Sequence, residues 1–242
     1  MWALIVLGCV VGTILSLALL YVIVVFVSAA LVNPDKEYEK HSGYYRWLLN
    51  SATWFAVRGA RIKLHANGVE KIPKGRFLVV GNHLSNWDPI LTWYVMPRAK
   101  LSFISKEGNF HIPAFGRIIR RCCFMVIDRG DARESLKTLH RAAEMIKKDE
   151  VNYGIYPEGT RNREPEKGLL PFHNGVFKIA QQANVPIVVV AVRGTEKVAG
   201  NFPWHKTDVY LDICDVIPPE EHVKSRTQEI GARVEADLKA VL

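Results

Sequence analysis

Hydrophobic and polar positions divide the chain into an apolar beginning and a patterned remainder. Residues 2–32 are strongly apolar, interrupted only by Gly8, Gly12, Thr13, Ser16 and Ser28. A helix that spans a bilayer needs about 20 apolar residues, so this run can cross once with tilt or enter as a broken helix. No Lys or Arg precedes it, and it is too long for the apolar part of a signal peptide. We therefore expect an uncleaved membrane anchor.

Aromatic side chains recur at helical spacing just after this run. They are Tyr44, Trp47, Trp54 and Phe55, accompanied by Leu48 and followed by basic residues up to Arg61. Aromatic rings beside basic groups are typical of the lipid headgroup layer. A helix that faces the core of a soluble domain would give the same spacing, and the position after an anchor favours the interface. We expect an anchor over 1–33, an interfacial helical segment over 34–64 and a folded domain over 65–242.

The remainder alternates between short runs typical of strands and longer runs with helical periodicity. Strands are predicted where β-branched and aromatic residues gather, at 77–80, 101–105, 123–127, 152–156, 186–192 and 208–217. Helices are predicted at 131–148, 173–183 and 220–241. This alternation predicts an α/β fold, with a mixed, mostly parallel sheet flanked by helices and preceded by the membrane-anchoring helix.

Composition and charge indicate which classes of binding partner the protein favours. No charged side chain precedes Asp35, yet the chain carries a net charge of +8. A basic protein favours an anionic partner, and the apolar beginning favours a membrane surface over nucleic acid. The first basic residues follow the anchor, which predicts a domain on the cytoplasmic face of the cell membrane. The four cysteines form no CxxC pair, so neither a zinc site nor a disulfide framework is indicated.

The first candidate site is the segment from Asn82 to Asp88, directly after the strand at 77–80. Ligands of open α/β sheets bind beyond the carboxyl ends of strands, so His83 lies where chemistry is expected. Histidine accepts a proton near neutral pH, and Asp88 is close enough along a turning chain to orient its ring. A surface histidine followed by a helix-capping aspartate would give the same spacing.

The second candidate site follows the strand at 152–156. Here Glu158, Gly159 and Arg161 occur together, and the planar guanidinium of arginine can hold a phosphate through two hydrogen bonds. Gly159 permits a tight turn or a close approach to a ligand. A simple salt bridge between Glu158 and Arg161 is the alternative, although it leaves unexplained why charged loops follow two separate strands.

Two further cations also follow predicted strands. Lys106 comes after the strand at 101–105, and Arg129 after the one at 123–127. No nucleophile motif such as Gly-x-Ser-x-Gly is present, so a histidine base would activate a nucleophile that the substrate supplies. The residues alone therefore predict a membrane-attached α/β protein with a His–Asp base and cations for a phosphate.

The ordered set of motifs resembles one family. The segments that carry the resemblance are Asn82-His83-x4-Asp88, Lys106 to Arg129, Pro157-Glu158-Gly159-Thr160-Arg161, Pro171 to Lys178 and Val185-Pro186-Ile187-Val188. Together they are similar to the bacterial 1-acyl-sn-glycerol-3-phosphate acyltransferases, or lysophosphatidate acyltransferases. The resemblance covers residues 65–215. One departure is Val189, where the family often has proline, and we interpret it as a local packing change.

The resemblance implies acyl transfer from acyl-CoA or acyl-carrier protein to the sn-2 hydroxyl of lysophosphatidate, giving phosphatidate. It implies no metal and no organic cofactor. Carried onto this chain, it makes His83 the general base and Asp88 the residue that orients it. The substrate-binding residues would be Arg161, with Lys106 as helper, a weaker Arg129, and the loop residues Glu158, Gly159 and Thr160.

Other functions remain open at this point. The acceptor could be glycerol 3-phosphate, another lysophospholipid or an aminolipid, and a non-catalytic membrane lipid-binding protein is the alternative outside enzymes. A nucleic-acid role is disfavoured, because the basic residues are not interleaved with aromatic residues for stacking.

Overall fold

A seven-stranded sheet forms the centre of the structure, a computed structural model that describes residues 1–128 and 130–242. The order of strands across the sheet is β1-β7-β6-β2-β5-β3-β4. Every neighbouring pair is parallel except β6 and β7, which are antiparallel. The strands are β1 (Ile62–Asn67), β2 (Leu78–Gly81), β3 (Leu101–Ser105), β4 (Met125–Val126), β5 (Asn152–Ile155), β6 (Ile187–Arg193) and β7 (Thr207–Ile217). The expected mixed, mostly parallel sheet is confirmed.

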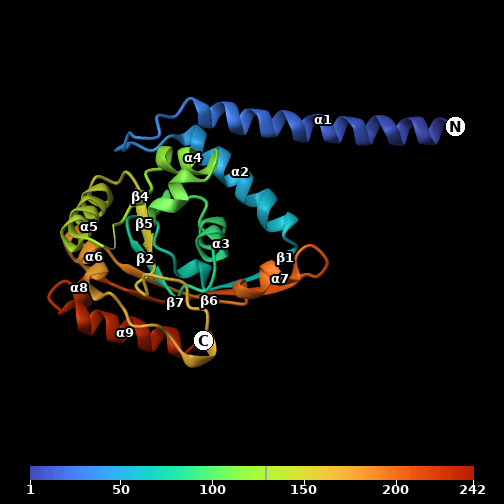
Figure 1. Ribbon diagram of the computed structural model, residues 1–242. Helices are drawn as coiled ribbons and strands as arrows, with labels where there is room; N and C mark the ends of the chain where they lie inside the picture. The colour runs from blue at the N-terminus through green and yellow to red at the C-terminus, as the bar shows by residue number, and fades with distance from the viewer. Residues whose placement is uncertain (129) are drawn as a thin grey trace.

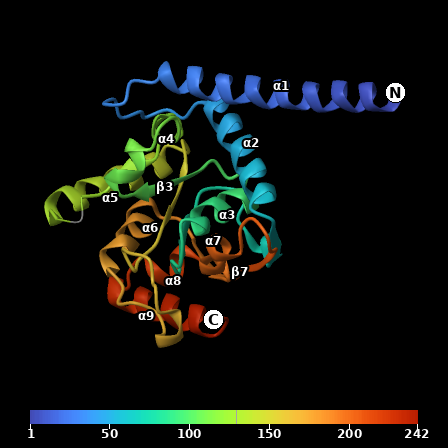
Figure 2. The same ribbon diagram turned by 45° about the vertical axis from the view of Figure 1, so that its right-hand side comes forward.

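Helices cover both faces of the sheet, as Figures 1 and 2 show. Along β6, Ile187 and Val189 pack in one core with α5, α6 and α9, whereas Val188 and Val190 pack in a second core with α2, α3 and α4. Burial on both faces explains why this strand is apolar throughout. The helices are α1 (Trp2–Ala30), α2 (Gly43–Gly59), α3 (Trp87–Val95), α4 (Phe115–Arg121), α5 (Ala132–Lys147), α6 (Lys178–Ala183), α7 (Val198–Asn201), α8 (Pro219–His222) and α9 (Thr227–Lys239).

Helix α1 extends away from the rest of the chain (Figure 1). Its mean hydropathy reaches 2.8 over 18 residues, none of which is buried within the protein, so it is long and apolar enough to cross a membrane. Its last turns rest on α2, where Tyr21 Oη lies 2.9 Å from Ser51 Oγ and Ser28 Oγ lies 2.7 Å from Tyr44 Oη. The carboxyl end of α1 is therefore fixed against the domain.

Helix α2 has two different faces. Leu48, Leu49 and Val57 are buried in the core, while Trp47 and Trp54 are exposed. The alternative of a core-facing helix is thus correct for one face, and the exposed aromatic face remains available for the predicted contact with lipid. The expected division at residue 64 falls inside β1, which pairs along its whole length with β7.

Two of the predicted elements differ from the structure. The helix expected over 220–241 is two helices, because the Glu229 side chain accepts the Arg226 N–H and starts α9 anew. The strand expected over 123–127 is reduced to β4, since Cys123 adopts a left-handed backbone with φ of +62°. Helix α4, just before it, was not predicted, and its Gly116 lies where any Cβ would collide with the carbonyl of Phe110.

Candidate active site

Three neighbouring parallel strands bring the candidate residues together. In the order β6-β2-β5, Thr195 follows the first strand, His83 the second and Glu158 the third. Because the carboxyl ends of parallel strands lie at one edge of a sheet, the three loops meet there. The sequence predicted two of these loops, after β2 and β5.

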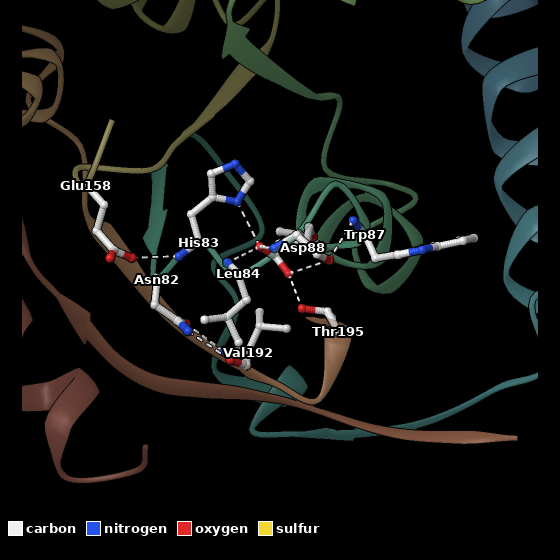
Figure 3. Close-up of polar contacts among 10 residues, drawn as sticks. Asn82, His83, Leu84, Trp87, Asp88, Glu158, Val192 and Thr195 are labelled. Carbon is white, nitrogen blue, oxygen red and sulfur yellow. Dashed lines mark hydrogen bonds and ion pairs between the residues drawn. The ribbon is translucent and has the colours of Figure 1, made fainter. Parts of the chain in front are cut away.

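The Asp88 carboxylate organises the loop after β2 (Figure 3). It lies in the first turn of α3 and is completely buried. Its Oδ2 accepts hydrogen bonds from His83 Nδ1 at 2.7 Å and from the backbone N–H groups of Leu84 and Ser85 at 2.6 and 2.8 Å. Its Oδ1 accepts from the hydroxyl of Thr195. A carboxylate that accepts this many hydrogen bonds is held in one orientation.

His83 is fixed through its backbone as well as its ring. Its N–H donates to Glu158 Oε1 at 2.7 Å, and its carbonyl accepts the N–H of Asn162 at 2.6 Å. Nδ1 of the ring contacts Asp88, so Nδ1 carries the proton in the neutral ring and the lone pair is on Nε2. Nε2 makes no hydrogen bond within residues 1–128 and 130–242.

A stack of aromatic rings supports the imidazole. The ring of Tyr156 lies against His83 with centroids 4.3 Å apart and planes 12° apart, and Phe103 lies beyond Tyr156. Phe103 reaches this position because Gly154 has no side chain; a Cβ there would come within 2.3 Å of the Phe103 ring. Burial, together with the nearby Asp88 carboxylate, raises the pKa of Tyr156 well above its ordinary value. The stack is therefore neutral and restricts how the imidazole can turn.

Glu158 joins the two loops from inside the protein. Its side chain is buried, and each carboxylate oxygen accepts one backbone N–H, Oε1 from His83 and Oε2 from Leu170 at 3.0 Å. Burial raises the pKa of Glu158 above the ordinary glutamate value, although both hydrogen bonds oppose the shift. No ion pair joins Glu158 to Arg161 among the described residues, so the simple salt-bridge alternative does not apply.

The remaining predicted residues lie around this centre. Gly159 has φ of +67°, and a Cβ there would lie 2.7 Å from the ring of His173, so the turn requires glycine. Thr160 is exposed, and Arg161 is half-buried, with no hydrogen bond or ion pair in the described part of the chain. Lys106 is exposed beyond the end of β3, and no hydrogen bond joins it to His83 in the described part of the chain. Arg129 lies outside the described residues.

Three further residues shape the site: Asn82, which belongs to the predicted segment but had no assigned role, and Asn162 and Thr195, which were not singled out from the sequence. Asn82 exchanges two hydrogen bonds of 2.8 Å with the backbone of Val192, Asn162 holds the carbonyl of His83, and Thr195 binds Asp88. The pattern already used, polar residues after a strand, would have indicated Thr195 had it been applied to the strand at 186–192. Across residues 1–128 and 130–242, no group of three or more His, Cys, Asp and Glu side chains is arranged to hold a metal ion.

This geometry is one in which His83 can act as a general base. The Nε2 lone pair is open, Asp88 can stabilise the charge that the ring gains on accepting a proton, and the side chain of His83 retains 16% exposure. Burial raises the pKa values of the Cys122 and Cys123 thiols to about 12, so both remain protonated at neutral pH.

Comparison with known proteins identifies the family. The sequence model of the acyltransferase family matches residues 63–193, which is more than half of the chain. The chain therefore belongs to the acyltransferase family, and the resemblance drawn from its motifs is confirmed. The matched region runs from β1 to the end of β6 and contains both the His83 loop and the Glu158 loop.

The similar proteins narrow the class further. The 1-acyl-sn-glycerol-3-phosphate acyltransferase of Haemophilus influenzae is 30% identical over 65% of this chain and 64% of its own length. The enzyme of the same name from Saccharomyces cerevisiae is 30% identical over 69% of this chain and 55% of its own. The chain thus spans less than two thirds of these relatives. A crystal structure of the 1-acyl-sn-glycerophosphate (LPA) acyltransferase PlsC from Thermotoga maritima matches with a TM-score of 0.62 and 26% identity, covering 82% of both chains.

Proposed function

We propose that this protein transfers a fatty acyl group to the sn-2 hydroxyl of 1-acyl-sn-glycerol 3-phosphate and so makes phosphatidate. The observation that carries the proposal is the hydrogen bond of 2.7 Å between His83 Nδ1 and the buried Asp88 carboxylate, which leaves Nε2 open. The names of the similar proteins support the choice of acceptor. The donor is acyl-CoA or acyl-carrier protein, both of which are thioesters.

The reaction needs a base and alignment. His83 Nε2 takes the proton of the acceptor hydroxyl while its oxygen attacks the thioester carbonyl carbon. The tetrahedral intermediate expels the donor thiolate, and the imidazolium returns the proton to that sulfur, so an ester and a free thiol are formed. General-base assistance of this kind contributes about 10²–10⁴-fold, and alignment of the reactants adds more.

Cations beside the base hold the acceptor phosphate in this proposal. Arg161 is adjacent to Asn162, whose N–H binds the carbonyl of His83, so its backbone is anchored next to the base. Its guanidinium has no partner among the described residues and can form two hydrogen bonds with a phosphate. Lys106 follows β3, farther along the same edge, and would assist. Arg129, which lies outside the described residues, is proposed as a further helper. Gly159 and Thr160 form the turn that leads into Arg161.

The substrates place the protein at a membrane. Both lipids carry acyl chains, and α1 is apolar enough to remain in a bilayer. We assign residues 1–33 to the anchor, residues 34–64 to the interface and residues 65–242 to the acyltransferase domain. The basic residues that follow α1 favour the cytoplasmic face of the cell membrane, where acyl thioester donors occur.

The first test replaces the base. Purified His83→Ala protein in vesicles should lose transfer from either donor to lysophosphatidate, with the product measured by mass spectrometry. His140→Ala is the matched control, because His140 is exposed on α5, far along the chain from the site, and should keep wild-type turnover. Near-normal turnover by a folded His83→Ala protein would remove His83 from its role.

The second test separates the phosphate site from a structural role. Arg161→Ala should chiefly impair the phosphorylated acceptor, whereas monoacylglycerol, which lacks the phosphate, should be used equally by wild type and variant. Arg163→Ala, an exposed arginine two residues later, is the control. An equal loss with both acceptors would make Arg161 structural. A panel that adds glycerol 3-phosphate, other lysophospholipids and an aminolipid identifies the acceptor itself.

A further inference from the structure

A turn of exposed aromatic residues joins α7 to β7. It comprises residues 202–206, here called the aromatic turn, and all five side chains are exposed. The exposed fraction of Phe202 is 53%. That of Trp204 is 79%, the highest of any large hydrophobic residue described after residue 31. Two neighbouring exposed aromatic rings are unusual for a surface that only water contacts, and indicate an interaction site.

The aromatic turn is held in one shape at its base. The N–H of His205 donates to the carbonyl of Asn201 at 2.8 Å, and the Asn201 side chain donates to Thr207 Oγ1 at 3.0 Å. Arg61, just after α2, donates from Nη1 to the carbonyl of Pro203 at 3.3 Å, and its own carbonyl accepts the N–H of Thr207. The rings are therefore presented by a braced turn that is joined to the end of α2.

Three basic residues lie in the aromatic turn or near the end of α2. Lys206 lies in the aromatic turn, and Arg61 donates to the carbonyl of Pro203 in that turn. Arg58, near the end of α2, stacks on the Trp54 ring at 3.9 Å. None of these three cations forms an ion pair within residues 1–128 and 130–242. The acidic residue nearest in sequence, Asp208, is already bound to Lys63 and His65. Aromatic rings with unpaired cations fit the anionic headgroup layer of a phospholipid membrane.

The aromatic turn also faces the direction in which α1 leaves the domain. Figure 1 shows the turn after α7 at the edge toward which the free part of α1 points, and Figure 2 shows α2 running from α1 down to that edge. Residues 21–30 of α1 rest on the domain, which leaves residues 2–20 free. That free part is about 28 Å long at about 1.5 Å per residue, close to the thickness of a hydrocarbon core.

We infer that the aromatic turn is a membrane contact in addition to α1 and the exposed aromatic face of α2, and that it inserts Phe202 and Trp204 into the headgroup layer of an anionic phospholipid bilayer. A helix that crosses the bilayer leaves the domain free to rotate about the helix axis. A contact at the end of α2, beyond the aromatic face of that helix, restricts this rotation, so one face of the domain is turned to the lipid. The inference concerns membrane attachment alone and holds whichever acceptor the enzyme uses.

The experiment places a fluorophore next to the rings without removing them. His205→Cys carries the label in a full-length background in which Cys9 and Cys214 are serine; Cys122 and Cys123 remain, because they are buried. Lys148→Cys, an exposed position directly after α5, carries the same label as a control. Figure 1 shows α5 and α7 on opposite sides of the fold. Vesicles contain nitroxide-labelled lipid with the spin label in the headgroup, with and without phosphatidylglycerol.

Strong quenching is expected for the label at 205 and little for the label at 148, with more quenching when phosphatidylglycerol is present. Replacing both rings, in Phe202→Ser/Trp204→Ser protein, should reduce quenching at 205 to the level at 148 while the protein stays bound to the vesicles through α1. Three results would each overturn the inference: equal quenching at 205 and 148, unchanged quenching after loss of both rings, or no response to the anionic lipid.

Discussion

Substitution of Asp88 by asparagine removes the charge of the site while keeping its shape. The asparagine carbonyl can take the place of Oδ2, where it accepts from His83 Nδ1 and from the N–H groups of Leu84 and Ser85. Its amide then faces Thr195, whose hydroxyl can accept a hydrogen bond as readily as donate one. The three N–H groups that bind Oδ2 keep an acceptor, so the variant should fold.

The loss of turnover should be large because the missing charge stabilises the imidazolium. In the free enzyme His83 is neutral when it acts as a base, and the carboxylate 2.7 Å away matters most when the ring gains its proton. The upper limit is the whole general-base contribution, about 10²–10⁴-fold. At about 1.4 kcal/mol for each factor of ten, that limit is about 3–6 kcal/mol in the activation free energy.

The assay measures kcat and KM for lysophosphatidate with saturating donor, beside urea unfolding of the same preparations. We expect kcat to fall by about 10²-fold or more with little change in KM, because Asp88 touches the base and not the acceptor. Asp88→Ala is a poorer variant, since it leaves three buried N–H groups without an acceptor and destabilises the loop. A folded Asp88→Asn protein with near wild-type kcat would refute the assignment of His83 and Asp88 as the catalytic pair.

Two further predictions concern the residues that hold this pair. Thr195→Val keeps the volume but removes the hydroxyl that donates to Asp88, so the free energy of unfolding should fall by about 1.5–3 kcal/mol, and Thr195→Ser should restore it. No difference between the valine and serine variants in urea unfolding would contradict this. Burial raises the pKa of Glu158, so the folded protein binds this proton more tightly than the unfolded chain, and the stability that the bound proton confers is lost as pH rises. The unfolding free energy of wild type should therefore decline relative to that of Glu158→Gln as pH rises from about 4.5, the ordinary glutamate value. A wild-type unfolding free energy that instead rises relative to the variant over this range would contradict the argument.

The sequence predicted the contact between His83 and Asp88, because the two residues are close along the chain. His83 and Asp88 are five residues apart, and a strand followed by a helix start brings them into contact, as expected from the pattern. Glu158 belongs to a different strand, and its loop could be placed beside His83 because parallel strands end at one edge. Its role within the site could not be predicted, because sequence pattern does not show that its carboxylate turns inward to bind two backbone N–H groups.

Features that depend on strand order or on backbone conformation were missed. Thr195 reaches Asp88 only because β6 lies beside β2, and the order of strands was beyond the sequence. The shortened β4 follows from the left-handed conformation of Cys123, a residue whose type gives no sign of it. The break before α9 depends on the side chain of Glu229, within a run whose apolar spacing continues across the break.

The two hydrogen bonds of the His83 backbone limit how the proposed acceptor specificity could change. Glu158 holds the N–H of His83 and Asn162 holds its carbonyl, and between them lie only Gly159, Thr160 and Arg161. Insertions or deletions in this short stretch would displace His83, the proposed base. A new acceptor headgroup would therefore be accommodated by exchanging side chains at 160 and 161, at constant loop length.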